Sequence, residues 1–157
     1  MNSNNFEIKK KKLLISFKEN RFEEVISDGV NLLEQRQNDA QLIYILGLSS
    51  INLQNFNDAE KFFKKLTLFN KTAENFYTLG NIQKKQKKFE DAIESFKEAI
   101  KANPNFSEAY NNLGSTQKTL NKFEEAILSY KKAIDLKASN VQAYYNLASL
   151  FYLLENY

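Results

Sequence analysis

The clearest indication of the fold lies in residues Ala73 to Phe106, AENFYTLGNIQKKQKKFEDAIESFKEAIKANPNF. The apolar residues of this stretch recur at a helical period in two blocks, which a short polar segment around Lys87 and Lys88 separates. A connection this short keeps successive helices antiparallel. The stretch therefore predicts two amphipathic helices that fold into a hairpin.

The same small residues return along the chain at an almost constant spacing. Three glycines are separated by 33 and 34 residues: Gly47, Gly80 and Gly114. Three alanines follow them, each 12 residues after its glycine: Ala59, Ala92 and Ala126. Two interleaved series with one period indicate an internal repeat. We predict repeats over about 6–39, 40–72, 73–106 and 107–140, and a half repeat over 141–157.

This repeat resembles the tetratricopeptide repeat (TPR) family. Residues 73–106 carry an aromatic residue, Leu-Gly, Ala, a second aromatic residue, a small residue and Pro at the positions of that pattern, which are Phe76, Leu79, Gly80, Ala92, Phe96, Ala99 and Pro104. The resemblance covers almost all of the chain. It implies an all-α fold, a right-handed superhelical solenoid of antiparallel hairpins with about four and a half repeats and nine helices. The whole chain, 1–157, would then be one TPR array.

The first repeat departs from the pattern. Gly29 stands where later repeats have an aromatic ring, and a glycine inside a helix costs about 1 kcal/mol relative to alanine. We therefore expect poor packing in this hairpin. The run of four lysines over residues 9–12 predicts a solvated capping face, because a terminal repeat has one side in water. Contact with an acidic surface is the alternative interpretation.

Composition excludes several classes of function. The chain of 157 residues has no Cys and no His, so the commonest general base and metal ligands are missing and no disulfide can form. We expect no catalytic residue, no metal and no cofactor. A net charge of +3 is too small for a typical nucleic-acid binder, and no apolar run is long enough for a membrane span. We expect a cytoplasmic protein that binds neither nucleic acid nor membrane.

The resemblance also implies where a partner binds. In a TPR array the first helix of each hairpin lines the concave face, and its polar positions contact an extended peptide. The residues expected at these positions are Tyr77, Thr78, Asn81, Lys84, Asn111, Asn112, Ser115, Lys118, Gln142, Tyr145, Asn146 and Ser149. Asn amides both donate to and accept from a peptide backbone, and Tyr provides contact area at low entropic cost.

Two binding modes known in TPR proteins can be compared with these positions. Chaperone-binding TPR domains hold a carboxylate with Lys, Asn, Asn, Lys and Arg. Asn81 and Asn112 match the two asparagines, but Tyr77, Gln142 and Asn146 replace the three cations, so this clamp is not supported. Arrays similar to O-GlcNAc transferase carry a ladder of asparagines, which Asn112 and Asn146 match in part. A solvated or intrahelical role for these two amides is the alternative.

A basic segment, QKKQKK over residues 83–88, contains the densest positive charge inside the array. Its simplest interpretation is a solvated turn, because lysine is favourable near the C-terminus of a helix. Binding to an acidic patch of a partner is the functional alternative, and such binding would weaken with salt. Whether this segment binds anything stays open.

The last predicted helix has an apolar face, and the sequence contains no following helix that could pack against it. Its packing face includes Leu147, Leu150, Phe151 and Leu154, whereas arrays normally end in a polar capping helix. The chain is a fragment of a longer protein, or this face forms a homo-oligomer, or it binds another protein. Self-association through Leu147, Leu150, Phe151 and Leu154 is the expectation that can be measured.

These features favour a protein-protein interaction scaffold that binds a peptide or partner protein and catalyses nothing. The alternative is the N-terminal, substrate-recruiting TPR segment of a larger enzyme of the glycosyl- or sulfotransferase type. The unfinished last hairpin motivates this alternative. The reading frame beyond Tyr157 distinguishes the two, because a capping helix favours the scaffold and a long α/β-patterned extension favours the enzyme.

Overall fold

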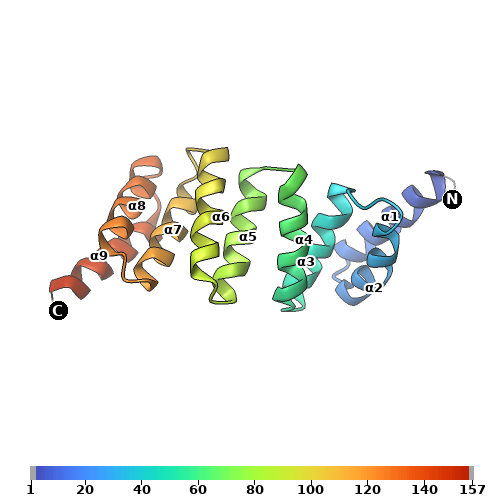
Figure 1. Ribbon diagram of the computed structural model, residues 1–157, viewed down its shortest axis with the longest axis horizontal. Helices are drawn as coiled ribbons and strands as arrows, with labels where there is room; N and C mark the ends of the chain where they lie inside the picture. Colours follow the sequence, from blue (N-terminus) through green and yellow to red (C-terminus); the bar gives the residue numbers. More distant parts are fainter. Residues whose placement is uncertain (1–2, 156–157) are drawn as a thin grey trace. The chain divides into compact units, whose positions relative to one another are not determined.

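The computed structural model describes residues 3–155, and every regular element in that range is an α-helix (Figure 1). The nine helices of this range confirm the all-α prediction and the expected number of helices. The chain divides into two compact units, residues 1–70 and 71–157. Both units consist of antiparallel helix hairpins.

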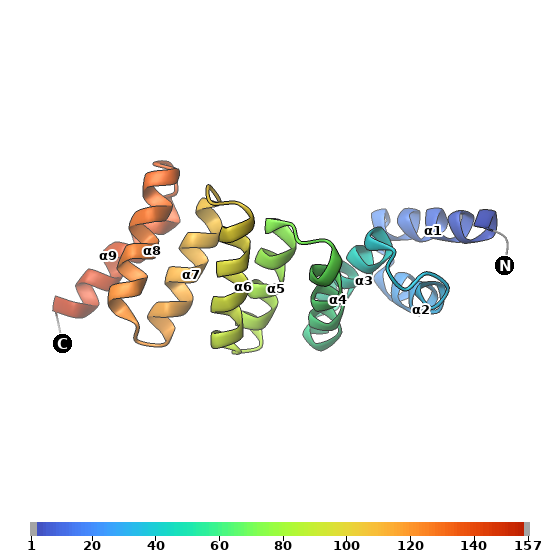
Figure 2. The ribbon, with the colours of Figure 1, turned by 45° about the horizontal axis from the view of Figure 1, so that its top comes forward.

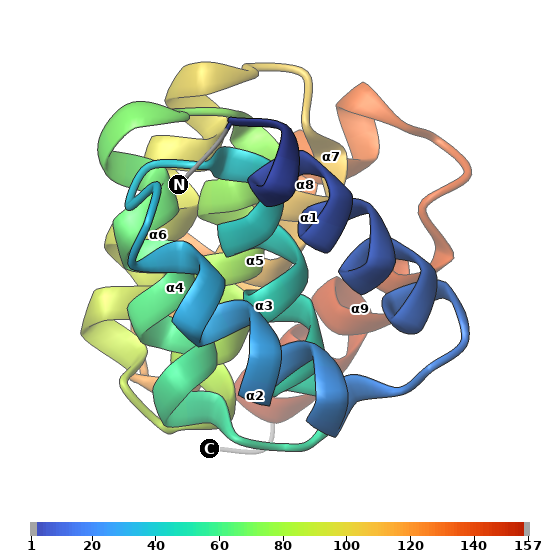
Figure 3. The ribbon, with the colours of Figure 1, turned by 90° about the vertical axis from the view of Figure 1, so that its right-hand side faces the viewer.

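The first unit contains two hairpins. Its helices are α1 (Ser3–Lys18), α2 (Phe22–Leu33), α3 (Ala40–Asn52) and α4 (Phe56–Phe69). Helix α3 packs against both helices of the first hairpin, α1 and α2 (Figure 3). This arrangement is the stacking that repeat proteins use to bury a continuous core.

The second unit contains two hairpins and one further helix. Its helices are α5 (Ala73–Lys85), α6 (Phe89–Ala102), α7 (Ser107–Thr119), α8 (Phe123–Leu136) and α9 (Val141–Glu155). Helix α7 packs against α6 as well as against its own partner α8, and α9 packs against α8 (Figure 2). Helices α5 and α6 lie within residues 73–106, and α7 and α8 lie within residues 107–140.

The turn inside each complete hairpin has the same backbone conformation. One residue of each turn is left-handed, with φ between 57° and 60°: Asn20, Gln54, Lys87 and Asn121. In the third hairpin the Lys88 amide donates to the Gln83 carbonyl at 2.9 Å, and the Lys87 amide donates to the Lys84 carbonyl at 3.1 Å. This pair of bonds is the Schellman motif that ends many helices. None of these four residues is glycine, so each turn carries some backbone strain.

Glycine and an aromatic ring meet inside three of the hairpins. A methyl group added to Gly80 would lie 2.7 Å from Cε1 of Phe96, and one added to Gly114 would lie 2.9 Å from Cδ1 of Tyr130. Gly47 faces Phe63 in the same way, at 2.7 Å. The glycines of the pattern therefore let the two helices of a hairpin approach closely.

Large apolar residues fill the space between successive hairpins of the second unit. Phe96 is 0% exposed and forms one cluster with Ala92, Ile93 and Leu113, the last of which belongs to the next hairpin. Full burial of a side chain of this kind contributes about 1.5–3 kcal/mol. Pattern residues such as Ala92 and Phe96 are therefore core residues.

In the first hairpin the small and the large residue of this pair have exchanged places. Leu13 occupies the position that corresponds to Gly47, and Gly29 occupies the position that corresponds to Phe63. A methyl group on Gly29 would lie 3.6 Å from Leu13 Cδ1 and 2.8 Å from Leu46 Cδ2. The expectation of poor packing is thus too simple, because two leucine side chains occupy the space of the missing ring.

The lysines of α1 fall into two groups. Lys9, Lys11 and Lys12 are exposed, which agrees with the expected solvated face. Lys10 is different, because its ammonium lies 2.9 Å from the Asp39 carboxylate, with both side chains largely buried. Asp39 in turn accepts a hydrogen bond from the backbone N–H of Leu42 and caps α3. Lys10 therefore links α1 to the start of the next hairpin.

Candidate functional site

The candidate residues lie on α5, α7 and α9, which we call the inner helices (Figure 1). Each is the first helix of its repeat, and α7 contacts both α5 and α9. The three inner helices run in the same direction, because an antiparallel helix separates each from the next. Equivalent positions of successive repeats therefore form rows across the inner helices.

Amide side chains join the inner helices through a directed series of hydrogen bonds. Gln142 Nε2 donates to Asn146 Oδ1 at 3.0 Å, and Asn146 Nδ2 donates across to Asn111 Oδ1 on α7 at 2.9 Å. Asn111 Nδ2 lies 3.4 Å from Asn112 Oδ1. Asn112 Nδ2 donates to Asn81 Oδ1 on α5 at 2.8 Å. The intrahelical interpretation of Asn112 and Asn146 is therefore incomplete, because both amides bond to a neighbouring helix.

Tyr77 supports this row of amides from α5. Its hydroxyl accepts a second hydrogen bond from Asn112 Nδ2, at 3.1 Å. The ring centroid lies 4.9 Å from that of Phe106 and 6.0 Å from that of Phe96. Tyr77 thus connects the polar surface to the core, and it is only half-buried.

Two lysines on the inner helices make equivalent contacts one repeat apart. Lys84 Nζ donates to Ser115 Oγ at 2.9 Å, and Lys118 Nζ donates to Ser149 Oγ at 3.1 Å. All four side chains are half-buried. Burial, and after it the positive charge of Lys85, lowers the pKa of the Lys84 ammonium.

Ser115 also connects the surface to a buried phenol. Burial raises the pKa of Tyr130 to about 12, and the hydrogen bond with Ser115 partly offsets this effect. Tyr130 is 1% exposed and packs against the inner face of α9. The hydroxyl of Ser115 therefore lies between the lysine at the surface and the core.

The remaining candidates differ in how accessible they are. Tyr145 is 69% exposed and Gln142 is exposed, so both side chains are available to a ligand. Asn111 is only 8% exposed, and its amide is engaged in the series described above. Thr78 is half-buried, and its hydroxyl donates to the Glu74 carbonyl of its own helix at 2.8 Å.

Sequence reasoning missed a buried polar pair that recurs in two hairpins. Ser95 Oγ donates to Gln83 Oε1 at 2.6 Å, and Ser129 Oγ donates to Gln117 Oε1 at 2.7 Å. All four residues are buried. Gln83 and Gln117 directly precede Lys84 and Lys118 in the sequence, and Ser95 and Ser129 lie on the second helix of the same hairpins. The signal was present, because Gln and Ser recur 12 residues apart with the period of the repeat. These pairs position the inner helices.

The basic segment over residues 83–88 is not one surface. Lys85, Lys87 and Lys88 are exposed around the turn, whereas Lys84 is half-buried and points to Ser115. Lys84 therefore bonds to α7, whereas the other three lysines of the segment are exposed. A role of the exposed lysines in binding stays a prediction.

The residues expected to self-associate on α9 separate into two groups. Leu150 is 0% exposed and packs with Ala126 and Tyr130, and Leu147 packs against this cluster. Phe151 and Leu154 are 43% and 37% exposed. Leu150 is thus a core residue, and only the second group is available to a partner.

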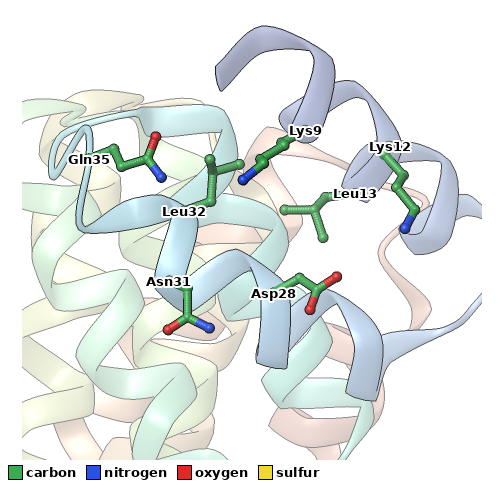
Figure 4. A pocket seen from close by; sticks show the side chains of 7 residues that line it. All are labelled: Lys9, Lys12, Leu13, Asp28, Asn31, Leu32 and Gln35. Atoms are coloured by element: carbon green, nitrogen blue, oxygen red, sulfur yellow. The ribbon is translucent and has the colours of Figure 1, made fainter. Parts of the chain in front are cut away.

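The first unit contains an open pocket between α1 and α2 (Figure 4). Its volume is about 450 Å³. The lining residues are Lys9, Lys12, Leu13, Asp28, Asn31, Leu32 and Gln35. In later repeats the positions of Lys9 and Lys12 hold apolar residues such as Ile43 and Leu46, which are fully buried. The pocket therefore lies at the solvated, first face of the stack.

Residues 3–155, which the structure describes, lack two further types of site. No group of three or more acidic residues there is placed to hold a metal ion. No helix of that range combines the length and apolar character needed to cross a lipid bilayer. The cytoplasmic location expected from the sequence stays a prediction.

Family models match most of the chain. Models described as tetratricopeptide repeat match residues 40–72, 73–106 and 95–127, and one described as TPR repeat matches residues 119–154. No curated protein matches the chain in sequence.

Solved TPR structures share the fold at low sequence identity. The crystal structure of the MamA protein is 23% identical, with a TM-score of 0.88 over 93% of this chain and 80% of that chain. YrrB, described as a TPR protein with an unusual peptide-binding site, is 20% identical with a TM-score of 0.81, over 92% of this chain and 75% of YrrB. The first TPR of Spaghetti (RPAP3), bound to the HSP90 peptide SRMEEVD, is 21% identical with a TM-score of 0.70, over 76% and 94%. These similarities confirm the all-α solenoid class.

Proposed function

The chain belongs to the tetratricopeptide repeat family, and we propose that its inner helices α5, α7 and α9 bind an extended segment of a partner protein. The observation that carries the proposal is the row of amides from Gln142 to Asn81. It places amide donors and acceptors on three neighbouring helices. Such a surface suits the regularly spaced N–H and C=O groups of a peptide backbone.

The unused bonding capacity of Asn146 supports this function. Its amide nitrogen has two protons, and one of them is donated to Asn111. Its oxygen accepts from Gln142 and retains a second lone pair. Asn146 is half-buried, so a peptide that adds one donor and one acceptor would complete its hydrogen bonds. Tyr145, exposed on the same helix, offers contact area beside it.

The proposal assigns binding and no reaction to this chain. The inner-helix residues are amides, hydroxyls and lysines, which are suited to recognition. The surrounding hairpins hold these residues on rigid helices, which reduces the entropic cost of binding. The comparison with YrrB and with the first TPR of Spaghetti, which is bound to a peptide, supports peptide binding as a use of this fold.

A random peptide library selected against the chain tests the proposal. We expect selected peptides to lose affinity for the double variant Asn112→Ala, Asn146→Ala, by about tenfold or more for two lost ligand hydrogen bonds. The matched control is Asn31→Ala, Asn105→Ala, which removes two exposed amides outside the inner helices. Circular dichroism of each variant verifies that its helices persist. Unchanged affinity of the folded Asn112→Ala, Asn146→Ala variant would contradict the proposal.

A second candidate function is association with another copy of the chain through α9. Tyr144, Phe151 and Leu154 are 50%, 43% and 37% exposed on that helix, and Ala148 between them is exposed as well. Removal of this apolar area from water would favour a dimer. Light scattering should detect a mass that increases with concentration, and Phe151→Lys should abolish the increase. A constant monomer mass at high concentration would contradict this candidate.

A further inference from the structure

The two lysines that bond to serines differ from the lysines of the outer helix α6. Lys97 lies 2.8 Å from Glu94 and Lys101 lies 3.2 Å from Glu98, so each has a carboxylate within its own helix. Lys84 and Lys118 form no ion pair with any carboxylate of residues 3–155. Each ammonium is half-buried against a neutral hydroxyl.

A half-buried ammonium group that has no carboxylate beside it is incompletely stabilised, so that an anion would stabilise it further. Burial removes part of the hydration of the ammonium, and a serine hydroxyl does not replace it with negative charge. The lowered pKa of Lys84 agrees with this loss of hydration. The nearby C-terminus of the helix, with its partial negative charge, compensates for only part of this loss. An anionic ligand would interact with the same ammonium more strongly, because the site is partly desolvated.

The two lysines share one edge of the inner-helix surface. Lys84 is the twelfth residue of α5 and Lys118 is the twelfth residue of α7. Glu74 and Glu108 are the second residues of the same helices. Because the inner helices run in the same direction, positive charge lies along one edge and negative charge along the other. The amide row lies between these edges.

We propose that Lys84 and Lys118 form two anion-binding positions along this edge, and that they select an extended peptide with two acidic side chains three residues apart. This inference rests on the proposed function and names the chemistry of its partner. Helices in contact lie about 8–10 Å apart. Three residues of polyproline II conformation advance about 9 Å and return the side chain to the same side. The spacing of the two acids therefore matches the spacing of the lysines.

Three synthetic peptides, acetylated and amidated at their ends, test the inference by NMR titration of the full chain. GSEAAEAGS carries glutamates three residues apart, GSQAAQAGS replaces them with glutamines, and GSEAEAAGS places the glutamates two residues apart. We expect GSEAAEAGS to bind about tenfold more tightly than the glutamine peptide, with GSEAEAAGS between them. The preference for glutamate should decrease as salt is added.

Charge-removing variants locate the effect. Lys84→Met and Lys118→Met should each lower the affinity for GSEAAEAGS by about threefold. Neither substitution should change the affinity for GSQAAQAGS. Lys132→Met is the matched control, because it removes an exposed lysine from α8 in the same unit. This control should not lower the affinity for either peptide by threefold.

The outcomes separate this inference from the function on which it rests. If glutamate and glutamine peptides shift the inner-helix resonances with equal affinity, the acidic preference is wrong and peptide binding stands. An equal loss in Lys132→Met and in Lys84→Met would also overturn the inference, because the effect would then reflect net charge. If no peptide, including any from the random library, shifts these resonances, both proposals are wrong.

Discussion

The two units use the same hairpin but present different side chains from the first helix of each repeat. In the first unit α3 carries Ile45, Leu48 and Ile51 in the rows where the second unit carries amides, serines and lysines. Ile45 is 3% exposed, and Leu48 and Ile51 are half-buried. The period of the repeat therefore determines the scaffold, and the residues between the pattern positions determine what each unit can bind.

The units also differ in how one hairpin is packed. Gly80 and Phe96 pair in the second unit, whereas Leu13 and Gly29 pair in the first hairpin. The large residue has moved from the second helix to the first. Because Leu46 also approaches Gly29, the space is filled by two flexible side chains where one rigid ring fills it elsewhere. This comparison predicts a different tolerance to substitution in the two places.

The largest expected effect is the removal of a ring from the core of the second unit. Phe96→Ala should lower the free energy of unfolding by about 3–5 kcal/mol, because the ring is fully buried between two hairpins. Leu128→Ala, at a residue that is 69% exposed on α8, is the control and should change it by less than about 0.5 kcal/mol. Urea unfolding followed by circular dichroism measures both. If both variants lost a similar free energy of unfolding, the packing of Phe96 between the two hairpins would not be a major source of stability.

Substitutions at Leu13 and Gly29 can restore the order of the other hairpins, with glycine on the first helix and an aromatic ring on the second. Leu13→Gly should destabilise by leaving a cavity, and Gly29→Phe should destabilise by overpacking against Leu13 and Leu46. The double variant should recover part of the loss, with a coupling energy of about 1–3 kcal/mol, since it restores the arrangement of the other hairpins. The same unfolding experiment on all four proteins gives the coupling. Simple additivity of the two single effects would contradict the interpretation.

Adding one methyl group compares the two glycines directly. Gly80→Ala should destabilise by about 1 kcal/mol, because the methyl group would lie 2.7 Å from a fixed ring and overpacking exceeds the gain in helix propensity. Gly29→Ala should be within about 0.5 kcal/mol of neutral, because only the end of the Leu46 side chain must move. Midpoints of thermal unfolding rank the two variants. A greater loss for Gly29→Ala would reverse the comparison.

The smallest effect concerns an ion pair of the second unit. A hydrogen bond from Lys137, at 2.8 Å, lowers the pKa of the Glu108 carboxyl. A group whose pKa is lowered on folding stabilises the protein above its unfolded pKa of 4.5, and this contribution is lost as pH falls through the folded value. Both side chains are about half exposed, so the contribution is below about 1 kcal/mol. Glu108→Gln should flatten the stability curve below pH 4.5, and an unchanged curve would contradict this assignment.

Sequence alone predicted the hairpins because their signals are local and periodic. Small residues, aromatic residues and polar turns recur with one spacing, and each has a physical role within about 34 residues. The exchange of Leu13 and Gly29 was missed because only the absent ring was considered, although the two positions correspond one by one to Gly47 and Phe63. Comparing pairs of positions would have revealed it.

The chemistry of the inner helices was predicted in part. The spacing indicated which residues share the surface, and Asn112 and Asn146 do lie there. Their partners were not predictable, because a hydrogen bond between residues 31 or 35 positions apart depends on how two helices pack. Leu150 shows the same limit, since its burial against Tyr130 depends on the rotation of α9 over α8.

The location of the peptide-binding surface can be measured residue by residue. NMR of the full chain, titrated with a peptide selected from the random library, maps the residues whose environment changes on binding. We expect the largest changes at Asn81, Asn112 and Asn146, with smaller changes at Tyr77 and Tyr145. Changes confined to α1–α4, or to the exposed face of α9 around Phe151, would contradict the claim that the polar inner helices of residues 71–157 form the binding surface.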